Sequence, residues 1–480
     1  MLINFAFKSV VVGMLLILSS CAFPRFLINN KPSIYDDKNF PTTHIEKTES
    51  EDCHHGLINA PTELPALEEW VLGSYDEENK SIEEFLEETN TTAFIVVRND
   101  SLLFESYHND YEPTEQNIVF SVCKSIITSL VDIALQKGHI ESLDQSVSDF
   151  IPSFKDDGKE AVKIKHLLNM TSGLHHDDYG NLLQTGATYY HSNLDKVIDG
   201  SKVKIEPNKE FIYKSMDTQI LGSCIEAASQ QNIVSYLQEH LWEPLGMCNG
   251  ASFTLDSKKN KNARMFGGLA ISSNDLLKFG LLFLNDGIHN GERIISKEWI
   301  EQIKNRKAKK GSWYGYENGW WRDTFVGKSY LEDQDFYAAG FFGQYIYIDP
   351  NNNTMMIRLG ENKGKVRWQK CMSKLSKRLN NAPFNPYFSK IRPNAICGEY
   401  RSNDDQMLYI SCKDTLERTW KMQWHKNQNH KMSAIMQSSC ENTIYNLFKN
   451  ISLIFNHPKK ENMVLLDDGK GAMTTFMKIK

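Results

Sequence analysis

Residues 119–138, VFSVCKSIITSLVDIALQKG, decide the fold. The segment is apolar on all sides and ends at a glycine, which is typical of a central helix packed against several neighbours. At its start, Ser121 and Lys124 form an S-x-x-K motif, and residues three apart lie on one face of a helix. A serine attacks well only when a base takes its proton, and burial can lower the pKa of a lysine enough for that role. Cys123 should point elsewhere and be structural.

The two ends of the region around this helix have the pattern of β-hairpins. Residues 92–97 and 101–107 flank the turn residues Asn99 and Asp100, and residues 341–348 and 354–359 flank Asp349-Pro350-Asn351. Helical patterns lie between them, at 219–228, 233–240 and 273–285, and a last helix is expected at 365–379. We therefore expect an α/β (α+β) fold in which an antiparallel sheet is assembled from both ends of the region and a helical lobe is inserted.

A second, smaller module is expected after a proline-rich break near residue 385. Short β-like segments separated by turn residues fill the rest of the chain, which indicates a small antiparallel β domain over 390–480. The expected strands are 407–411, 419–424, 443–448, 451–455, 463–466 and 473–479. The catalytic-size domain would then cover 65–385.

The composition excludes several classes of protein. The chain has 480 residues, of which 41% are hydrophobic and 24% charged, as in ordinary globular proteins. The 54 Lys and Arg residues against 60 Asp and Glu residues give a net charge of −6, so nothing favours binding to a nucleic acid backbone. The nine cysteines are widely and irregularly spaced without a C-x-x-C pair, which argues against a zinc site.

The N-terminus has the pattern of an export signal. Lys8 precedes the apolar run at 10–18, and small residues then lead to Cys21, as in bacterial lipoprotein signals. We expect a signal peptide over 1–20 and a lipid-anchored Cys21, with a plain signal peptide as the alternative. Ala22 favours the outer membrane, on the periplasmic side, if the cell has two membranes. Residues 21–64 are polar and aperiodic and are expected to be a tether.

Export permits disulfide bonds. Cys397, Cys412 and Cys440 gather near the C-terminus, where a small β domain could use a covalent link. The sequence leaves the pairing open.

A set of segments resembles the serine β-lactamase and penicillin-binding-protein-like superfamily, in the branch of class C-type esterases and 6-aminohexanoate-dimer hydrolases. The resemblance covers about 90 to 380, with the segments in the family's order and spacing. The C-terminal module resembles the lipocalin-like appendages of some family members. The matching segments are 91–107, 120–152, 163–174, 211–215, 219–222, 241–247, 267–280, 319–321 and 340–350.

The resemblance implies roles for single residues. Ser121 matches the nucleophile, Lys124 its general base, and Tyr213 the second acid/base at the start of the Tyr-x-Ser/Asn motif. If Ser121 and Lys124 were absent, Tyr213 would be interpreted as an ordinary core tyrosine. Ser215 ends this motif and would hydrogen-bond the substrate or Lys124. The backbone amides of Ser121 and Phe341 would form the oxyanion hole.

One family motif departs from the pattern. Ala338-Ala339-Gly340 stands where penicillin-recognising members carry Lys-Thr-Gly. Gly340 still lets a substrate backbone approach, but the cation and hydroxyl that hold a carboxylate are absent. This argues against recognition of β-lactams and D-Ala-D-Ala, and the 6-aminohexanoate-dimer hydrolase branch shares the loss.

Two further residues are candidates for substrate binding. Trp321 matches a wall residue of the family's site, although both Trp320 and Trp321 also fit a core position. Asp178 follows the SGL motif, where a carboxylate could hold a substrate ammonium or belong to a solvated loop pair with Asp177.

The sequence therefore predicts a serine hydrolase that cleaves an amide or ester of a small molecule or short peptide through an acyl-Ser121 intermediate. No cofactor and no metal are expected, and the oligomeric state is left open. The alternatives are a D-Ala-D-Ala peptidase, or a catalytically weak or inactive envelope protein that binds cell-wall peptides.

Overall fold

The computed structural model describes residues 32–49, 57–59, 64–71, 80–176, 178, 182–306, 314–323, 334–379 and eight strands between 398 and 478. The expected signal peptide and Cys21 lie outside these residues. The chain divides into two compact units, one formed by 1–64 with 80–369 and the other by 65–79 with 370–480. Within the described residues, no helix is long and apolar enough to cross a bilayer.

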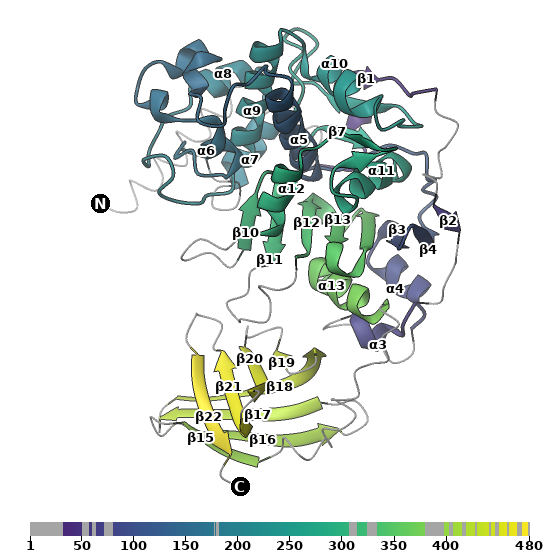
Figure 1. The fold of residues 1–480 in the computed structure, drawn as a ribbon, viewed down its shortest axis with the longest axis vertical. Helices are drawn as coiled ribbons and strands as arrows, with labels where there is room; N and C mark the ends of the chain where they lie inside the picture. The colour runs from purple at the N-terminus through teal and green to yellow at the C-terminus, as the bar shows by residue number, and fades with distance from the viewer. Residues whose placement is uncertain are drawn as a thin grey trace, which may run out of the picture. The chain divides into compact units, whose positions relative to one another are not determined.

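The first unit is built on an eight-stranded sheet in the order β10-β11-β12-β13-β14-β3-β4-β2. Strand β14 pairs antiparallel with β3, so the two ends of the region meet in one sheet, which confirms the predicted fold (Figure 1). Asn99 and Asp100 both have positive φ, as a tight hairpin turn between β3 and β4 requires. The strands are β10 Tyr314–Glu317, β11 Trp320–Asp323, β12 Phe336–Gly340, β13 Gln344–Asp349, β14 Thr354–Gly360, β3 Thr91–Arg98, β4 Ser101–Tyr107 and β2 Ile58–Asn59.

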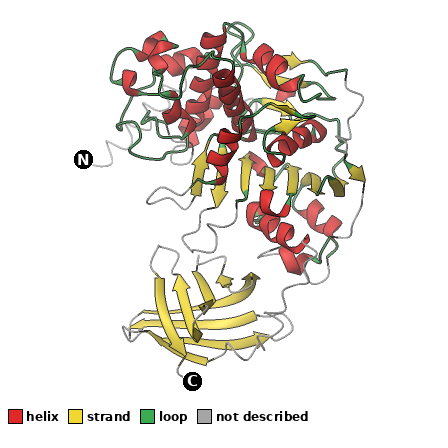
Figure 2. Ribbon diagram, viewed as in Figure 1, coloured by secondary structure: helices red, strands yellow, loops and turns green. Residues whose placement is uncertain are grey.

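Both faces of the central strands are covered, as Figure 2 shows. In β3, Ala93, Ile95 and Val97 belong to the main hydrophobic core. On the same sheet, β14 and the next strand, β13, contact helix α11, Ser273–Leu284. Phe94 points to the opposite face, where its ring lies 6.0 Å from that of Trp368. Because successive side chains of a strand alternate between faces, a strand buried on both sides is continuously apolar, as the run TAFIVV is.

The helical lobe lies between the two halves of the sheet in sequence. Its central helix is α5, Val122–Gln136, in which nearly every residue is buried. The expected helix over 233–240 ends at Leu237 and continues as a π-helical turn, Gln238–Trp242. Helix α3, Leu67–Trp70, belongs to the second unit, and α13, Trp368–Leu379, spans the division between the units. The other helices of the first unit are α4 Ile82–Glu88, α6 Ile164–Leu168, α7 Leu182–Tyr189, α8 Leu194–Asp199, α9 Ser215–Ser229, α10 Ile233–Leu237, α11 and α12 Lys297–Lys304.

A smaller sheet corrects the prediction of a tether over 21–64. Strand β1, Thr42–Ile45, pairs with β6, Ala251–Thr254, in the order β1-β6-β7-β5. The preceding Ile34 and Phe40 are buried in a cluster of apolar residues. Residues 32–49 therefore belong to the folded body, because a few apolar side chains within a polar segment are enough to dock it. The remaining strands are β7 Leu269–Ile271 and β5 Asn117–Ile118, and β5 leads directly into the segment before Ser121.

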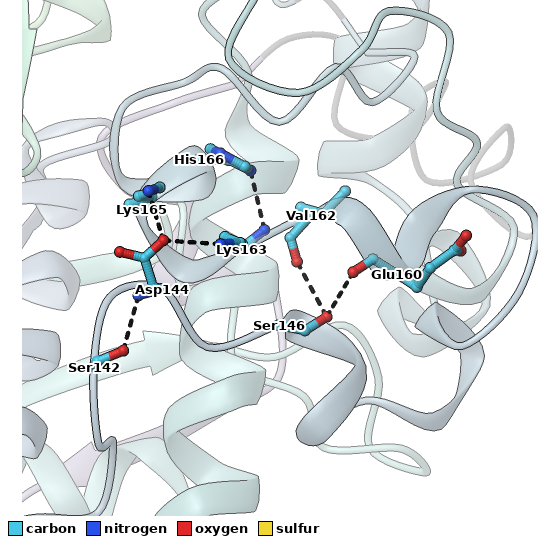
Figure 3. A network of polar contacts seen from close by, with 8 residues as sticks. All are labelled: Ser142, Asp144, Ser146, Glu160, Val162, Lys163, Lys165 and His166. Carbon is cyan, nitrogen blue, oxygen red and sulfur yellow. Dashed lines mark hydrogen bonds and ion pairs between the residues drawn. The ribbon is translucent and has the colours of Figure 1, made fainter.

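A polar network fixes the loop that precedes α6 (Figure 3). Asp144 accepts hydrogen bonds from Lys163 Nζ at 2.9 Å and from Lys165 Nζ at 2.6 Å. These two bonds lower the pKa of the exposed Asp144 carboxyl to about 2. Ser146 Oγ donates to the Glu160 carbonyl oxygen at 2.9 Å and so ties the two ends of the loop together. Helix α6 then leads to the SGL segment, 172–174, near the candidate site.

The second unit contains the predicted C-terminal β domain as a closed barrel, in which consecutive strands are neighbours. Strands β15 and β18 lie outside the predicted strands, because their polar and charged residues mask the alternating pattern. Cys412 lies in β16 and Cys440 in β18. The strands are β15 Gly398–Ser402, β16 Met407–Asp414, β17 Thr419–Asn427, β18 His430–Cys440, β19 Thr443–Asn446, β20 Ile451–His457, β21 Lys460–Asp467 and β22 Met473–Lys478.

Candidate active site

Ser121 and Lys124 lie together at the start of α5. Ser121 is the residue before the first helical residue, and Lys124 follows one turn later on the same face. Lys124 Nζ lies 2.8 Å from Ser121 Oγ, within hydrogen-bond distance. The S-x-x-K spacing thus brings a hydroxyl and an amine into direct contact, as a nucleophile and its base require.

The residue before Ser121 has an unusual backbone conformation. Phe120 has φ +47°, a left-handed conformation that is strained for a bulky side chain. Its ring is held in an aromatic cluster, at 5.4 Å from the Phe342 ring and 5.8 Å from the Phe341 ring. Strained residues persist where the surroundings fix them, and they concentrate at functional sites. At Phe120, the left-handed conformation turns the chain sharply from β5 into α5.

Lys124 is almost completely buried, with 1% of its surface exposed. Its ammonium nitrogen also donates to the Phe266 carbonyl oxygen at 2.8 Å and lies 5.2 Å from the centre of the Tyr213 ring. Burial lowers the pKa of Lys124 to about 8, against the opposing charge of Asp178. A lysine in this environment is neutral far more often near pH 7 than a solvated one, which suits a general base.

Tyr213 and Trp321 lie against each other beside Lys124. Tyr213 is buried in a cluster with Met170 and Tyr316, and the Trp321 ring packs on it at 5.0 Å. Trp320, by contrast, points into the core, where it packs on Phe283 and Phe336 on the other face of β11. Of the two tryptophans, the structure therefore places Trp321 at the candidate site.

The two amides expected to form an oxyanion hole belong to Ser121 and Phe341. The strand expected from Phe341 onward begins three residues later, because residues 341–343 form a 3-10 turn after β12. Within the described residues, no hydrogen bond engages the backbone N–H of Ser121 or of Phe341. The Gln344 side-chain amide donates to the Phe341 carbonyl oxygen at 3.2 Å and holds this turn. The Phe341 side chain is 59% exposed.

Gly340 lies against the segment before the serine. A Cβ atom at this position would overlap the Val119 carbonyl oxygen, so the absence of a side chain lets β12 approach the start of α5. Ala338 is buried in the core and Ala339 is half-buried. The small residues that stand in place of the Lys-Thr-Gly motif therefore allow close packing and carry no charge.

Asp178 connects to the Tyr213 motif. Its carboxylate oxygen Oδ2 accepts hydrogen bonds from the Ser215 backbone amide at 2.9 Å and from Ser215 Oγ at 2.5 Å. Ser215 thus pairs with Asp178, where the sequence predicted the substrate or Lys124. Oδ1 of Asp178 lies 3.2 Å from His176 Nε2. With 8% of its surface exposed, Asp178 is not part of a solvated loop pair.

Ser172, Lys214 and Asp217 form a second group of buried polar side chains. Ser172 Oγ donates to Asp217 Oδ1 at 2.7 Å, and the fully buried Lys214 Nζ lies 4.0 Å from Asp217 Oδ2. Burial raises the pKa of the Asp217 carboxyl to about 6, although Lys214 and the Ser172 hydroxyl oppose this shift. The Tyr213 motif is thus flanked by charged groups on both sides of its backbone.

The cysteines divide into two kinds. Cys123, Cys224 and Cys371 are buried and outside any disulfide bond, and burial raises the pKa of the Cys123 thiol to about 12. Cys123 Sγ donates to the Met265 carbonyl oxygen, away from Ser121, in a packing role. Cys248 is in a disulfide bond, and its partner is none of these three. Among the described residues, no group of His, Cys, Asp or Glu side chains could hold a metal ion.

Several residues of the site escaped the sequence analysis. The Phe266 carbonyl acts through its backbone, which no sequence pattern reveals. His176 lies beside Asp178 and Asp217 lies within reach of its charge only in the folded chain, although His176 is two residues from Asp178. The Phe120 conformation gives no signal in a residue type that prefers negative φ.

The fold and the site define the class of the protein. The family model described as Beta-lactamase matches residues 79–366, more than half of the chain, so the chain belongs to the Beta-lactamase family. It is 24% identical to the 6-aminohexanoate-dimer hydrolase of Paenarthrobacter ureafaciens over 300 residues, which cover 58% of this chain and 74% of the relative. The relatives point to hydrolase activity.

Solved structures share the fold. A structure titled "Putative 6-aminohexanoate-dimer hydrolase from Bacillus anthracis" superposes with a TM-score of 0.61 at 19% identity, over 74% of this chain and 93% of that one. A penicillin binding protein from Bacillus halodurans gives a TM-score of 0.50 at 14% identity, over 62% of this chain and 99% of that one.

Proposed function

We propose that the chain is a serine hydrolase that cleaves an amide or ester bond through an acyl-Ser121 intermediate. The observation that carries this proposal is the 2.8 Å contact between Lys124 Nζ and Ser121 Oγ at a buried site where the lysine pKa is lowered to about 8. Desolvation of the Lys124 charge costs free energy, so burial favours the neutral amine that can take the Ser121 proton.

The acylation step uses the two side chains and the two amides. Neutral Lys124 takes the proton of Ser121 Oγ as this oxygen bonds to the substrate carbonyl carbon. The negative charge that forms on the carbonyl oxygen is stabilised by the N–H groups of Ser121 and Phe341. When the carbon–nitrogen or carbon–oxygen bond of the substrate breaks, the leaving group takes a proton, and we assign its delivery to Tyr213.

Deacylation repeats these roles with water. A water molecule loses a proton to the Tyr213 phenolate and attacks the acyl carbon of acyl-Ser121, while protonated Lys124 returns its proton to Ser121 Oγ. The bond to Ser121 Oγ breaks, the serine regains its proton, and a carboxylic acid leaves. The same groups therefore serve both half-reactions, in opposite directions.

The surroundings of Ser121 favour an uncharged, apolar substrate. Aromatic rings flank the site, with Phe341 beside Phe120 and with Trp321 over Tyr213. Ala338 and Ala339 supply no cation for a substrate carboxylate. Short-chain esters and linear amides of small molecules or short peptides fit this setting better than β-lactams, which carry a carboxylate.

We also propose that the hydrolase acts outside the cytoplasm, anchored through an acylated Cys21. The signal pattern before Cys21 supports export. The disulfide bond of Cys248 supports it independently, because such bonds persist mainly in oxidising compartments. Mass spectrometry of the membrane-extracted protein should find an acylated Cys21 as its first residue, and Cys21→Ala should abolish the acylation. A mature N-terminus elsewhere would contradict the anchor.

Turnover of p-nitrophenyl esters tests the catalytic proposal. The form lacking residues 1–31 should hydrolyse p-nitrophenyl acetate and butyrate, and Ser121→Ala should abolish this activity. Ser125→Ala is the matched control, since Ser125 lies on the same helix but donates to the Gly319 carbonyl oxygen in the core. Near-wild-type activity of Ser121→Ala would rule out the proposal.

A further inference from the structure

Three hydrogen bonds join Asp178 to the Tyr213 motif. The Asp178 amide donates to the Tyr213 carbonyl oxygen at 3.2 Å, and the Ser215 amide and hydroxyl both donate to Asp178 Oδ2. One residue thus holds the backbone on both sides of position 214. These bonds connect Asp178 to the backbone that carries the Tyr213 side chain.

One oxygen of the Asp178 carboxylate is hydrogen-bonded, and the other makes no hydrogen bond within the described residues but lies beside an imidazole. Oδ2 accepts from Ser215, and Oδ1 lies 3.2 Å from His176 Nε2. All three residues are buried, so a substrate ammonium would have to break these contacts to reach the carboxylate. An occupied carboxylate of this kind is a poor anchor for a ligand and a good support for its neighbours.

Asp178 also acts on the charge of Lys124. Burial would raise the pKa of the Asp178 carboxyl, but the His176 imidazole, the charge of Lys124 and the Ser215 hydroxyl together hold it below its ordinary value. The carboxylate is therefore ionised and favours the protonated form of Lys124. Among the described residues, Asp217 and Lys214, which face each other at the start of α9, are also charged groups near this carboxylate.

We infer that Asp178 is a positioning residue, which fixes the Tyr213 motif through Ser215 and supplies the negative charge that faces Lys124, and that it is not a contact for a substrate ammonium. This inference rests on the proposed function, since it assigns Asp178 to the same site. It gives the buried Asp178–Ser215 pair a purpose that neither substrate binding nor packing alone explains.

Three variants separate the charge from the hydrogen bonds. In Asp178→Asn, the amide oxygen still accepts from Ser215 and only the charge is lost. Ser215→Ala keeps the charge and loses the hydroxyl bond. Asp178→Ala loses both. Each is compared with the wild type on a matched pair of substrates, hexanoyl p-nitroanilide and 6-aminohexanoyl p-nitroanilide, which differ by one amine, with p-nitrophenyl acetate for the pH profile.

For Asp178→Asn, we expect the rising limb of the kcat/KM pH profile to move about one unit lower, because the charge that favours protonated Lys124 is gone. Ser215→Ala should leave the limb in place and lower kcat about tenfold, and Asp178→Ala should lower kcat about ten- to a hundredfold. These effects should be equal for the two anilides.

Two results would overturn the inference. A loss confined to the amine-bearing anilide, with an unmoved pH limb, would make Asp178 a substrate contact. Asp178 would have no role in positioning if Ser215→Ala kept the wild-type kcat and the rising limb of the kcat/KM pH profile did not move in Asp178→Asn. Failure of the proposed function has a different signature, since Ser121→Ala would then still turn over both anilides.

Discussion

Gly340 lies so close to Val119 that a single added methyl group would overlap the Val119 carbonyl oxygen. This contact sets the distance between the end of β12 and the start of α5. Each of these elements carries one of the two amides of the proposed oxyanion hole, Phe341 after Gly340 and Ser121 after Phe120. The geometry of the proposed hole therefore depends on a glycine that is neither the nucleophile nor its base.

Gly340→Ala should impair turnover more than stability. The new methyl group must push β12 away from Val119, and a displacement of about 1 Å can cost on the order of a hundredfold in rate. We expect a fall in kcat of that size for p-nitrophenyl acetate, measured beside the thermal unfolding midpoint.

The matched control is Gly186→Ala. Gly186 lies in α7 with open space around it, so alanine there should leave kcat unchanged and stabilise the helix by up to about 1 kcal/mol. An unchanged kcat in Gly340→Ala would show that the spacing of the two amides is not critical.

The pH dependence follows from Lys124. Burial lowers its pKa to about 8, and the proposed base is the neutral amine. The neutral fraction grows as the pH rises through this value, so kcat/KM should increase about tenfold per unit below pH 8 and level off above it. The profile for p-nitrophenyl acetate between pH 5.5 and 9.5, corrected for spontaneous hydrolysis, measures this limb. A flat profile would exclude Lys124 as the base.

Ser121, Lys124 and Tyr213 should behave as one unit. In such units, single removals cost on the order of 10³ to 10⁶ in turnover, and a double variant is little worse than the worse single one. Ser121→Ala, Lys124→Ala, Tyr213→Phe and their pairs should therefore show losses that do not add. Additive losses would mean that the three side chains act in separate steps.

The N-terminal segment should be required for activity. Tyr189 Oη donates to Asp36 Oδ2 at 2.7 Å, and Ile34 and Phe40 pack in the same cluster as Phe120. A chain starting at residue 32 should retain full activity, whereas one starting at residue 50 should lose both stability and kcat, as esterase assays and thermal unfolding can show. Full activity in the shorter chain would separate this segment from the site.

The sequence could predict what short spacings encode. Ser121 and Lys124 are three residues apart on one helix, so their contact needs no knowledge of the rest of the fold. The hairpin around Asn99 and Asp100 is equally local. Tyr213 lies far from Ser121 in the chain, and only the resemblance to a family joined it to them.

The rest depends on contacts between distant segments. Composition predicted a tether over 21–64, yet strand β1 within it pairs with β6, some two hundred residues away in the chain. For Asp178, the sequence does not distinguish a substrate contact from a solvated pair, because nothing local shows that it meets Ser215. For Gly340, the sequence predicts close approach of a substrate, and the structure adds Val119 as its close neighbour.

Selectivity for substrates should follow from Ala338 and Ala339. A hydrogen bond between a cation and a substrate carboxylate contributes roughly 1.5 to 3 kcal/mol, about tenfold to over a hundredfold in recognition. Penicillins and cephalosporins should therefore be poor substrates beside small uncharged esters. The comparison is kcat/KM for nitrocefin against that for p-nitrophenyl butyrate. Nitrocefin turnover around 10⁶ per molar second or above would reveal another site for the carboxylate.

The most direct test of the central claim is the site of covalent modification by a fluorophosphonate. The reagent should add one phosphonyl group to the folded protein, and peptide mass spectrometry should locate it on Ser121. Labelling should vanish in Ser121→Ala and fall sharply in Lys124→Ala, while Ser125→Ala should label like the wild type. A wild-type protein that reacts at another residue, or not at all, would contradict the assignment of Ser121 as the nucleophile.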